Sequence, residues 1–127
     1  MLIDLSLAAA AEAAINDLMR DVTGVNAVVI SSEDGFEIAA RVQSKAQVAR
    51  LSAMASSLAA LGVLAGEESQ LGACDHIAIS AQNGNLIMLQ ARHSKMDLIL
   101  SIVTNEDAIF GQILYSGKRA VRMLEGA

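Results

Sequence analysis

The stretch of residues 28–42, VVISSEDGFEIAARV, predicts a β-hairpin. Branched apolar residues lead up to an Asp34-Gly35 pair, and apolar and polar residues alternate after it. Alternation with a period of two is typical of a strand that has one buried face. The Asp-Gly pair suits a two-residue type I′ turn, because both central positions of that turn need positive φ.

Each strand of this hairpin is predicted to direct one face toward a core. Val28 and Ile30 share a face of the first strand. On the return strand the residues expected to share a face are Phe36, Ile38, Ala40 and Val42, with Glu37 and Arg41 opposite.

A second hairpin and a fifth strand follow later in the chain. The segments HIAISAQ (76–82) and NLIMLQA (85–91) flank Asn83-Gly84, which is a strong hairpin signal. The segment MDLILSIVT (96–104) comes directly after them. Because tight turns join antiparallel neighbours, the sequence predicts an α+β fold with a five-stranded antiparallel sheet.

Helical periodicity marks the first segment, over residues 4–21. The apolar positions spaced for one helical face are Leu5, Ala8, Ile15, Leu18 and Met19. Gly24 is expected to end this helix, since glycine is common just past a helix C-terminus.

The last helix is predicted to begin near Thr104-Asn105, with Glu106 and Asp107 in its first turn. Its buried side is expected to hold Ile109, Ile113, Ala120, Val121 and Leu124. The basic residues near its end are Lys118, Arg119 and Arg122, and we expect them to complement the negative end of the helix dipole.

A long central helix is predicted to begin after Ser44, which forms a capping box with Gln47. Its core-facing stripe contains Val48, Leu51, Ala55, Leu58 and Gly62. A second face holds only small residues, namely Ala49, Ala53, Ser56 and Ala60. Small residues let another backbone approach closely, so this face suits contact with a second helix. Helix propensity alone gives an equally good account, in which the face is solvated.

Composition excludes several classes of function. The 127 residues are 54% hydrophobic and 2% aromatic with a net charge of −5, which indicates one domain, residues 1–127, with an aliphatic core. An acidic surface with few rings disfavours nucleic acid and anionic lipid as partners. The N-terminal apolar run contains Asp4 and Glu12 and so does not resemble a secretion signal. The segment SLAALGVLAG (57–66) is too short to span a bilayer, so we expect a cytoplasmic protein.

The Cys74-Asp75-His76 run is the best candidate for chemistry. On a strand, Cys74 and His76 point to the same face, with Asp75 on the other. Zinc needs four ligands, and the other histidine, His93, lies in a different predicted loop. No nucleophile motif or Gly-x-x-x-x-Gly-Lys-Ser/Thr phosphate loop occurs in the sequence. We therefore interpret Cys74 as a packed thiol and expect no enzyme activity, metal or cofactor.

The whole chain resembles the roadblock/dynein light-chain family. The resemblance rests on GVNAVVISSEDGFEIAA (24–40), the Ala/Ser/Leu-rich helix 46–65, the paired strands around Asn83-Gly84 and the terminal GKRAVRML (117–124). It implies a profilin-like sandwich with the long central helix on one face of the sheet and the terminal helices on the other.

The resemblance also implies homodimers, joined at sheet edges with central helices side by side, that act as docking platforms. Bacterial relatives of the MglB type bind small Ras-like GTPases and modulate their nucleotide cycle without a nucleotide site. The residues that this assigns to the dimer or partner interface are Ala49, Ala53, Ser56, Ala60, Ile77 and Ile79.

Our leading hypothesis is a non-enzymatic homodimer that regulates or scaffolds a small GTPase. A small-molecule sensory domain is the second, since sandwich folds of this shape resemble sensory domains, and it requires a cavity between sheet and helix. A structural adaptor subunit of a larger motor or filament assembly is the third.

Overall fold

The computed structural model of the chain describes residues 4–127, which fold into one five-stranded sheet between two helical layers. The elements in chain order are α1 (Leu5–Asp21), β1 (Val25–Ser32), β2 (Glu37–Arg41), α2 (Lys45–Glu68), β3 (His76–Ala81), β4 (Gly84–Arg92), β5 (Asp97–Asn105) and α3 (Phe110–Glu125). The strand order is β2-β1-β5-β4-β3, and every neighbouring pair is antiparallel. The predicted α+β sandwich is confirmed.

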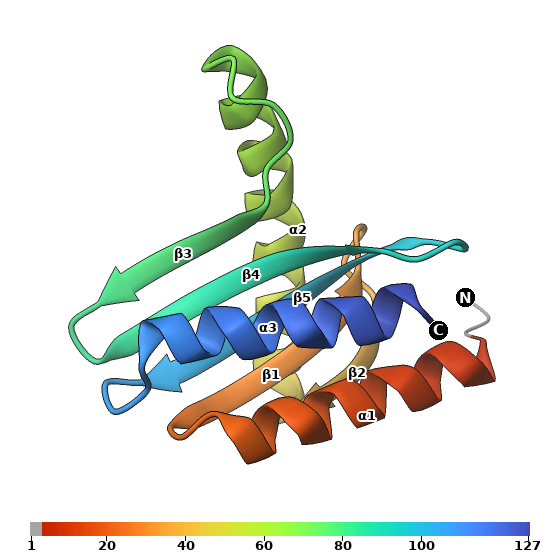
Figure 1. Ribbon diagram of the computed structural model, residues 1–127, viewed down its shortest axis with the longest axis vertical. Coiled ribbons are helices and arrows are strands. Elements are labelled where there is room, and N and C mark those ends of the chain that lie inside the picture. Colours follow the sequence, from red (N-terminus) through yellow and green to blue (C-terminus); the bar gives the residue numbers. More distant parts are fainter. Residues whose placement is uncertain (1–3) are drawn as a thin grey trace.

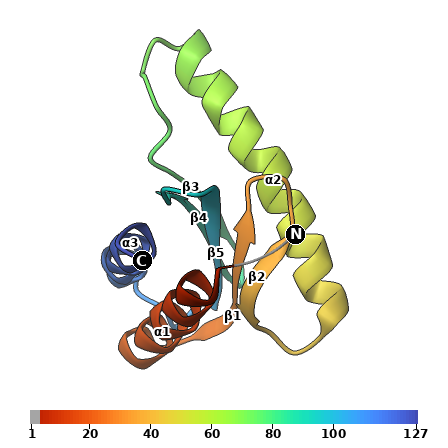
Figure 2. The ribbon, with the colours of Figure 1, turned by 90° about the vertical axis from the view of Figure 1, so that its right-hand side faces the viewer.

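The helices divide unequally between the two faces of the sheet. α1 and α3 lie side by side on one face, and α2 crosses the other (Figures 1 and 2). The largest core cluster joins α1 and α3 to the sheet through residues such as Leu18, Leu100 and Ile113, all fully buried. Two smaller clusters lie under α2.

Local sequence explains where α1 and α2 begin. The Asp4 carboxylate accepts a hydrogen bond from the Ser6 backbone N–H at 2.8 Å and caps α1. The Ser44 hydroxyl accepts one from the Gln47 backbone N–H at 3.2 Å, which confirms the serine half of the predicted capping box. Leu5, predicted on the buried face of α1, is 86% exposed because it lies in the first turn, outside the core stripe.

The β1–β2 turn differs from the predicted type I′ turn. Gly35 has φ of 96°, but Asp34 has no positive φ. The Gly35 N–H donates to the Ser32 carbonyl at 3.0 Å and the Ser32 N–H donates to the Phe36 carbonyl at 2.8 Å, which makes residues 33–35 a three-residue loop. The Ser32 hydroxyl stabilises this longer loop, because it donates to the Asp34 carboxylate at 2.6 Å and accepts from the Phe36 N–H at 3.0 Å.

A register shift next to this turn moves Ile38 away from its predicted face. Ile30 pairs with Ala39 and Ser31 pairs with Glu37, so Ile38 is the extra residue of a β-bulge. Ala40 packs beneath α2, whereas Ile38 packs against the core on the α1 side. The prediction that one face holds both residues was therefore wrong.

The second hairpin turns one residue earlier than Asn83-Gly84 suggests. Ala81 pairs with Gly84, which leaves Gln82 and Asn83 as the loop. Gly84 lies in β4 with φ of 154°, and a Cβ there would sit 1.9 Å from the Thr104 carbonyl oxygen. This glycine is thus required by close approach between β4 and β5.

α3 begins later than predicted, at Phe110, because β5 continues to Asn105. The Asn105 side chain accepts a hydrogen bond from the Asp107 backbone N–H at 2.9 Å, which forms a turn in place of a first helical turn. Ile113, Ala120 and Leu124 are buried as predicted, but Ile109 is 68% exposed.

Arg119 joins the two helices of the large layer. It donates to the Asp17 carboxylate at 2.9 and 3.0 Å and also contacts Asp21. Hydrogen bonding to Asp17 raises the pKa of Arg119 above its ordinary value. Arg119 therefore binds α1, and the prediction that it complements the end of its own helix was wrong.

The β4–β5 loop holds both ends of the helical layer. The Arg92 N–H donates to the Glu125 carboxylate at 2.8 Å. The His93 Nδ1 accepts from the Lys95 N–H at 3.1 Å, so its Nε2 donates to the backbone oxygen of Ala127 at 2.9 Å. The Lys95 side chain binds the Asp4 carboxylate.

We expect Gly84→Ala to lower the free energy of unfolding by roughly 2–3 kcal/mol, because its Cβ cannot fit against the Thr104 carbonyl. Chemical denaturation measures the change. The matched control is Gly111→Ala, where the Cβ meets nothing within 4 Å and a helix gains up to about 1 kcal/mol. Equal effects of the two substitutions would contradict the close contact.

We expect Asp4→Asn to make the melting temperature fall less steeply when the pH is lowered below about 4. Hydrogen bonds from Lys95 and Ser6 lower the pKa of Asp4, so its carboxylate stabilises the fold above about pH 4 and loses this effect as the pH falls further. Asparagine caps helices as well as aspartate does, which isolates the charge. The wild type should be more stable at pH 7, and the difference should narrow below about pH 4. A constant difference would argue against this ion pair.

Candidate functional site

α2 extends beyond the sheet that it covers. Its sheet-facing residues Val48, Leu51, Ala55 and Ala59 are buried, but its C-terminal half projects past the β3 edge (Figures 1 and 2). Beyond Ala59 the helix buries Gly66, where a Cβ would lie 2.3 Å from the Gly72 carbonyl oxygen of the returning chain. We call residues 60–71 the α2 projection.

The α2 projection carries apolar side chains in solvent. Leu61 is 58% exposed, Leu64 is 54% exposed and Leu71 is 80% exposed. Large apolar residues grouped on one segment mark interaction surfaces more often than single exposed ones do.

The two flanks of α2 differ in chemistry. The small-residue flank consists of the predicted residues Ala49, Ala53, Ser56 and Ala60, which are exposed apart from half-buried Ser56. The Ser56 hydroxyl donates to the Glu33 carbonyl at 2.8 Å, so this flank lies beside the β1–β2 loop. The apolar flank consists of Met54, Leu58 and Leu61. Their i, i+4, i+7 spacing is visible in the sequence and predicts one helical face. The interface predicted from the sequence did not include them.

α2 contacts its own sheet through its N-terminal half. Two separate clusters hold the helix, one around Val29 and Leu51 and another around Ala55 and Met88. The hydroxyls of Ser31, Ser52 and Ser101 are buried without a hydrogen-bond partner in the part of the chain that the structure describes. An unsatisfied buried hydroxyl costs about 1–3 kcal/mol. The two clusters under α2 are thus smaller than the one core cluster that joins α1 and α3 to the sheet.

β3 forms an open edge beside the α2 projection. It pairs with β4 on one side, and its other side has no strand within residues 4–127. Ile77 is half-buried and Ile79 is 42% exposed. A shallow hollow of about 440 Å³ lies over Ile79, Leu86 and Val103, on the sheet surface that α2 leaves uncovered.

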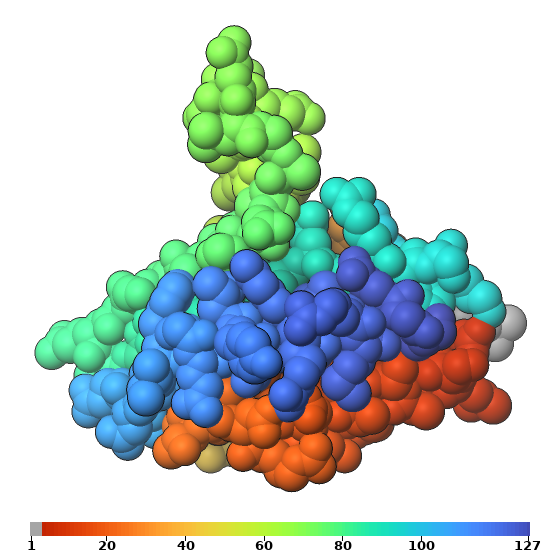
Figure 3. Space-filling model, in the orientation of Figure 1, coloured from red at the N-terminus to blue at the C-terminus, as the bar shows by residue number. Residues whose placement is uncertain are grey.

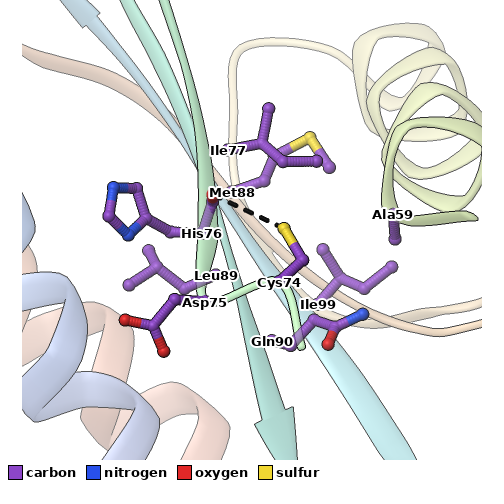
Figure 4. Close-up of a pocket in the computed structure, with 9 residues that line it drawn as sticks. All are labelled: Ala59, Cys74, Asp75, His76, Ile77, Met88, Leu89, Gln90 and Ile99. Atoms are coloured by element: carbon purple, nitrogen blue, oxygen red, sulfur yellow. Dashed lines mark hydrogen bonds between the residues drawn. The ribbon is translucent and has the colours of Figure 1, made fainter. Parts of the chain in front are cut away.

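The Cys74-Asp75-His76 run does not place the thiol and imidazole together. Cys74 points toward α2, whereas Asp75 and His76 lie on the α3 side (Figure 4). The prediction that Cys74 and His76 share a face was wrong, because β3 begins at His76 and Cys74 precedes its alternation. The Cys74 thiol contacts the His76 carbonyl at 3.6 Å and packs close to Gly62.

The pocket around Cys74 is too small for an organic ligand. It holds about 10 Å³ between α2 and the sheet, room for one water. Small-molecule sites usually measure hundreds of cubic ångströms. Residues 4–127 contain no group of three or more metal-ligating side chains.

α2 also has the length and apolar composition of a membrane span. Its most hydrophobic window has a mean hydropathy of 1.6. The segment 57–66, judged too short by itself, belongs to this helix of 24 residues. The N-terminal half of α2 packs against the sheet, and 28% of that hydrophobic window is buried in the part of the chain that the structure describes.

Comparison with known proteins agrees with this architecture. The family model described as "Mitogen-activated protein kinase kinase 1 interacting" matches residues 11–126. No curated protein matches the chain in sequence.

Several solved structures share the fold. A Roadblock/LC7 domain from Streptomyces avermitilis has a TM-score of 0.79 at 19% identity, covering 87% of this chain and 91% of that one. The gliding protein MglB from Thermus thermophilus has a TM-score of 0.84 at 16% identity, covering 99% and 93%. MglC from Myxococcus xanthus has a TM-score of 0.66 at 13% identity, covering 92% and 98%. The roadblock/MglB-like fold predicted from the sequence is confirmed.

We expect amides of the α2 projection to exchange hydrogen faster than those of residues 48–56 when the chain is dilute. The projection has few buried contacts, so local opening there costs little free energy. Hydrogen exchange with mass spectrometry over a dilution series measures both segments. Equal protection at the lowest concentration would contradict the weak attachment.

Proposed function

We propose a function from one premise: the chain belongs to the "Mitogen-activated protein kinase kinase 1 interacting" family. In this proposal it is a non-enzymatic, cytoplasmic homodimer that binds a small Ras-like GTPase and regulates or scaffolds it. The observation that carries the proposal is the α2 projection, which extends apolar side chains past an unpaired sheet edge.

A second copy paired at β3 would occupy both of these features. Antiparallel pairing of two β3 strands satisfies the open backbone groups along the outer side of β3 and removes an edge that favours aggregation. The α2 projection of each chain then extends over the sheet of the other. The hollow over Ile79, Leu86 and Val103 lies on that same sheet face.

The apolar flank is the better surface for the second copy. Leu58 packs in the cluster that includes Leu86, and Leu86 pairs with Ile79 near the middle of β3. A two-fold axis through β3 therefore lies on the side of Met54, Leu58 and Leu61. Burial of these larger side chains also contributes more free energy than burial of alanines.

The small-residue flank then remains open for the GTPase. Ala49, Ala53, Ser56 and Ala60 let a partner backbone approach closely, and the bond from Ser56 to the β1–β2 loop holds that flank in shape. The family resemblance supports a GTPase as partner, since MglB-type regulators bind small Ras-like GTPases. The sequence contains no phosphate-binding loop, so the nucleotide would belong to the partner.

An adaptor subunit of a larger assembly is the alternative that the same surfaces support. It differs from a GTPase regulator in its partner and not in its interface. The small pocket around Cys74 gives the sensory alternative no comparable support.

We expect Leu61→Arg to weaken the homodimer at least about tenfold, because it puts a charge into a buried apolar contact. Sedimentation equilibrium measures the dimer constant. The matched variant is Ala53→Arg on the small-residue flank, which we expect to leave the dimer intact. If Ala53→Arg dissociates the dimer and Leu61→Arg does not, the second copy lies on the small-residue flank instead.

We expect the wild type to bind the GTPase in one of its two nucleotide states. We expect Ala53→Arg to abolish this binding, because the arginine side chain prevents close approach of the partner. Small Ras-like GTPases of the source organism, each purified and loaded with GDP or a non-hydrolysable GTP analogue, are tested by calorimetry. Absence of state-dependent binding to any of them would exclude the GTPase and favour the adaptor role.

A further inference from the structure

We propose that the outer face of α3 is a second self-association surface, on which α3 of another copy packs antiparallel. This goes beyond the proposed function, because α3 lies on the opposite face of the sheet from α2 (Figure 2). α3 runs uncovered along one face of the molecule, with its outer side chains in solvent (Figure 3).

The centre and start of this face are apolar. Tyr115 is 64% exposed, Phe110 is 40% exposed and Leu114 is half-buried. Ile109 occupies the N-cap of α3, makes no side-chain capping bond and is 68% exposed. Isoleucine is among the poorest N-cap residues and gains nothing in solvent. Residues that break a local rule in this way are expected at functional sites, and an exposed Ile109 therefore indicates a contact surface.

The two ends of the face carry opposite charges. Glu106 and Asp107 precede the helix, and Lys118 and Arg122 lie toward its C-terminus. In the described part of the chain no ion pair involves Glu106, Asp107 or Arg122. Lys118 has one long contact, at 4.0 Å, to Asp75, which is 84% exposed.

Antiparallel packing of two α3 helices brings the acidic end of each helix next to the basic end of the other. The midpoint between Asp107 and Arg122 in sequence falls between Leu114 and Tyr115. A two-fold axis at that midpoint sets the acidic start of each helix against the basic end of the other, and it joins Leu114 to Tyr115 across the centre. Antiparallel helices also oppose their macrodipoles favourably.

A second copy fits this face better than an unrelated partner does. The face is complementary to itself, as a two-fold contact requires, because residue i meets residue j and residue j meets residue i. An unrelated basic partner would match the acidic end but would be repelled by Lys118 and Arg122.

The experiment uses two charge variants of the full chain. An acidic variant carries Lys118→Glu and Arg122→Glu, and a basic variant carries Glu106→Lys and Asp107→Lys. We expect each alone to self-associate at least about tenfold more weakly than the wild type at low salt, because like charges then oppose one another. Their equimolar mixture should recover association, since one surface is then wholly acidic and the other wholly basic. Sedimentation equilibrium up to high micromolar concentration measures all three samples.

Leu61→Arg separates this contact from the proposed α2–β3 dimer. In that background the α3 contact should still form dimers that the charge variants abolish. If the wild type forms tetramers and Leu61→Arg forms dimers, both contacts are supported. If charge reversal leaves the assembly unchanged, or if mixing fails to restore it, the α3 contact is overturned while the α2–β3 dimer is untouched. If Leu61→Arg alone has no effect, only the α2–β3 dimer fails.

Discussion

A helix of 24 residues is about 36 Å long, whereas five strands spaced at about 4.8 Å place the two outer strands about 19 Å apart. α2 begins at the β2 edge and crosses toward β3, so it is longer than the sheet can cover. The mismatch leaves the side chains of Leu61 and Leu64 more than half exposed. The two clusters that attach α2 to the sheet involve residues up to Ala59. The apolar side chains of the α2 projection are therefore free to pack against another molecule. A partner that covers the projection therefore gains apolar burial at little conformational cost.

The opposite layer has the reverse character. α1 and α3 bury a continuous aliphatic core against the sheet, and Arg119 ties them together through Asp17 and Asp21. The β4–β5 loop holds the start of α1 and the end of α3. Hydrogen bonds and ion pairs therefore connect α1, α3 and the end of β4 in this layer. The three aromatic residues, Phe36, Phe110 and Tyr115, are all exposed, and the core is built mainly from Leu, Ile, Val and Ala.

Sequence reasoning found the sheet because alternation and turn residues are local signals. The two hairpins, the Ser44 cap and the core stripe of α2 needed no information beyond neighbouring residues. Its errors arose where one hydrogen bond decides between similar conformations. The Ser32 hydroxyl selects a three-residue loop over a type I′ turn, and the Asn105 side chain turns the chain before α3 can begin. The predicted direction of the Cys74 side chain assumed that Cys74 lies in the strand. β3 begins two residues later, at His76, so the alternation of the strand does not apply to Cys74.

The flanks of α2 illustrate a different limit. Helical spacing groups Ala49 with Ala53 and Met54 with Leu58, but it does not tell which group faces the open edge of the sheet. That orientation depends on where β3 lies relative to the helix, which is a property of the tertiary structure. Ser56 bonded to Glu33 places one flank at the β1–β2 loop, and Leu58 beside Leu86 places the other over the strands that lead to Ile79. Since a helix has only two flanks once one face is packed on a sheet, a second copy on one of them leaves the other as the surface for a third protein.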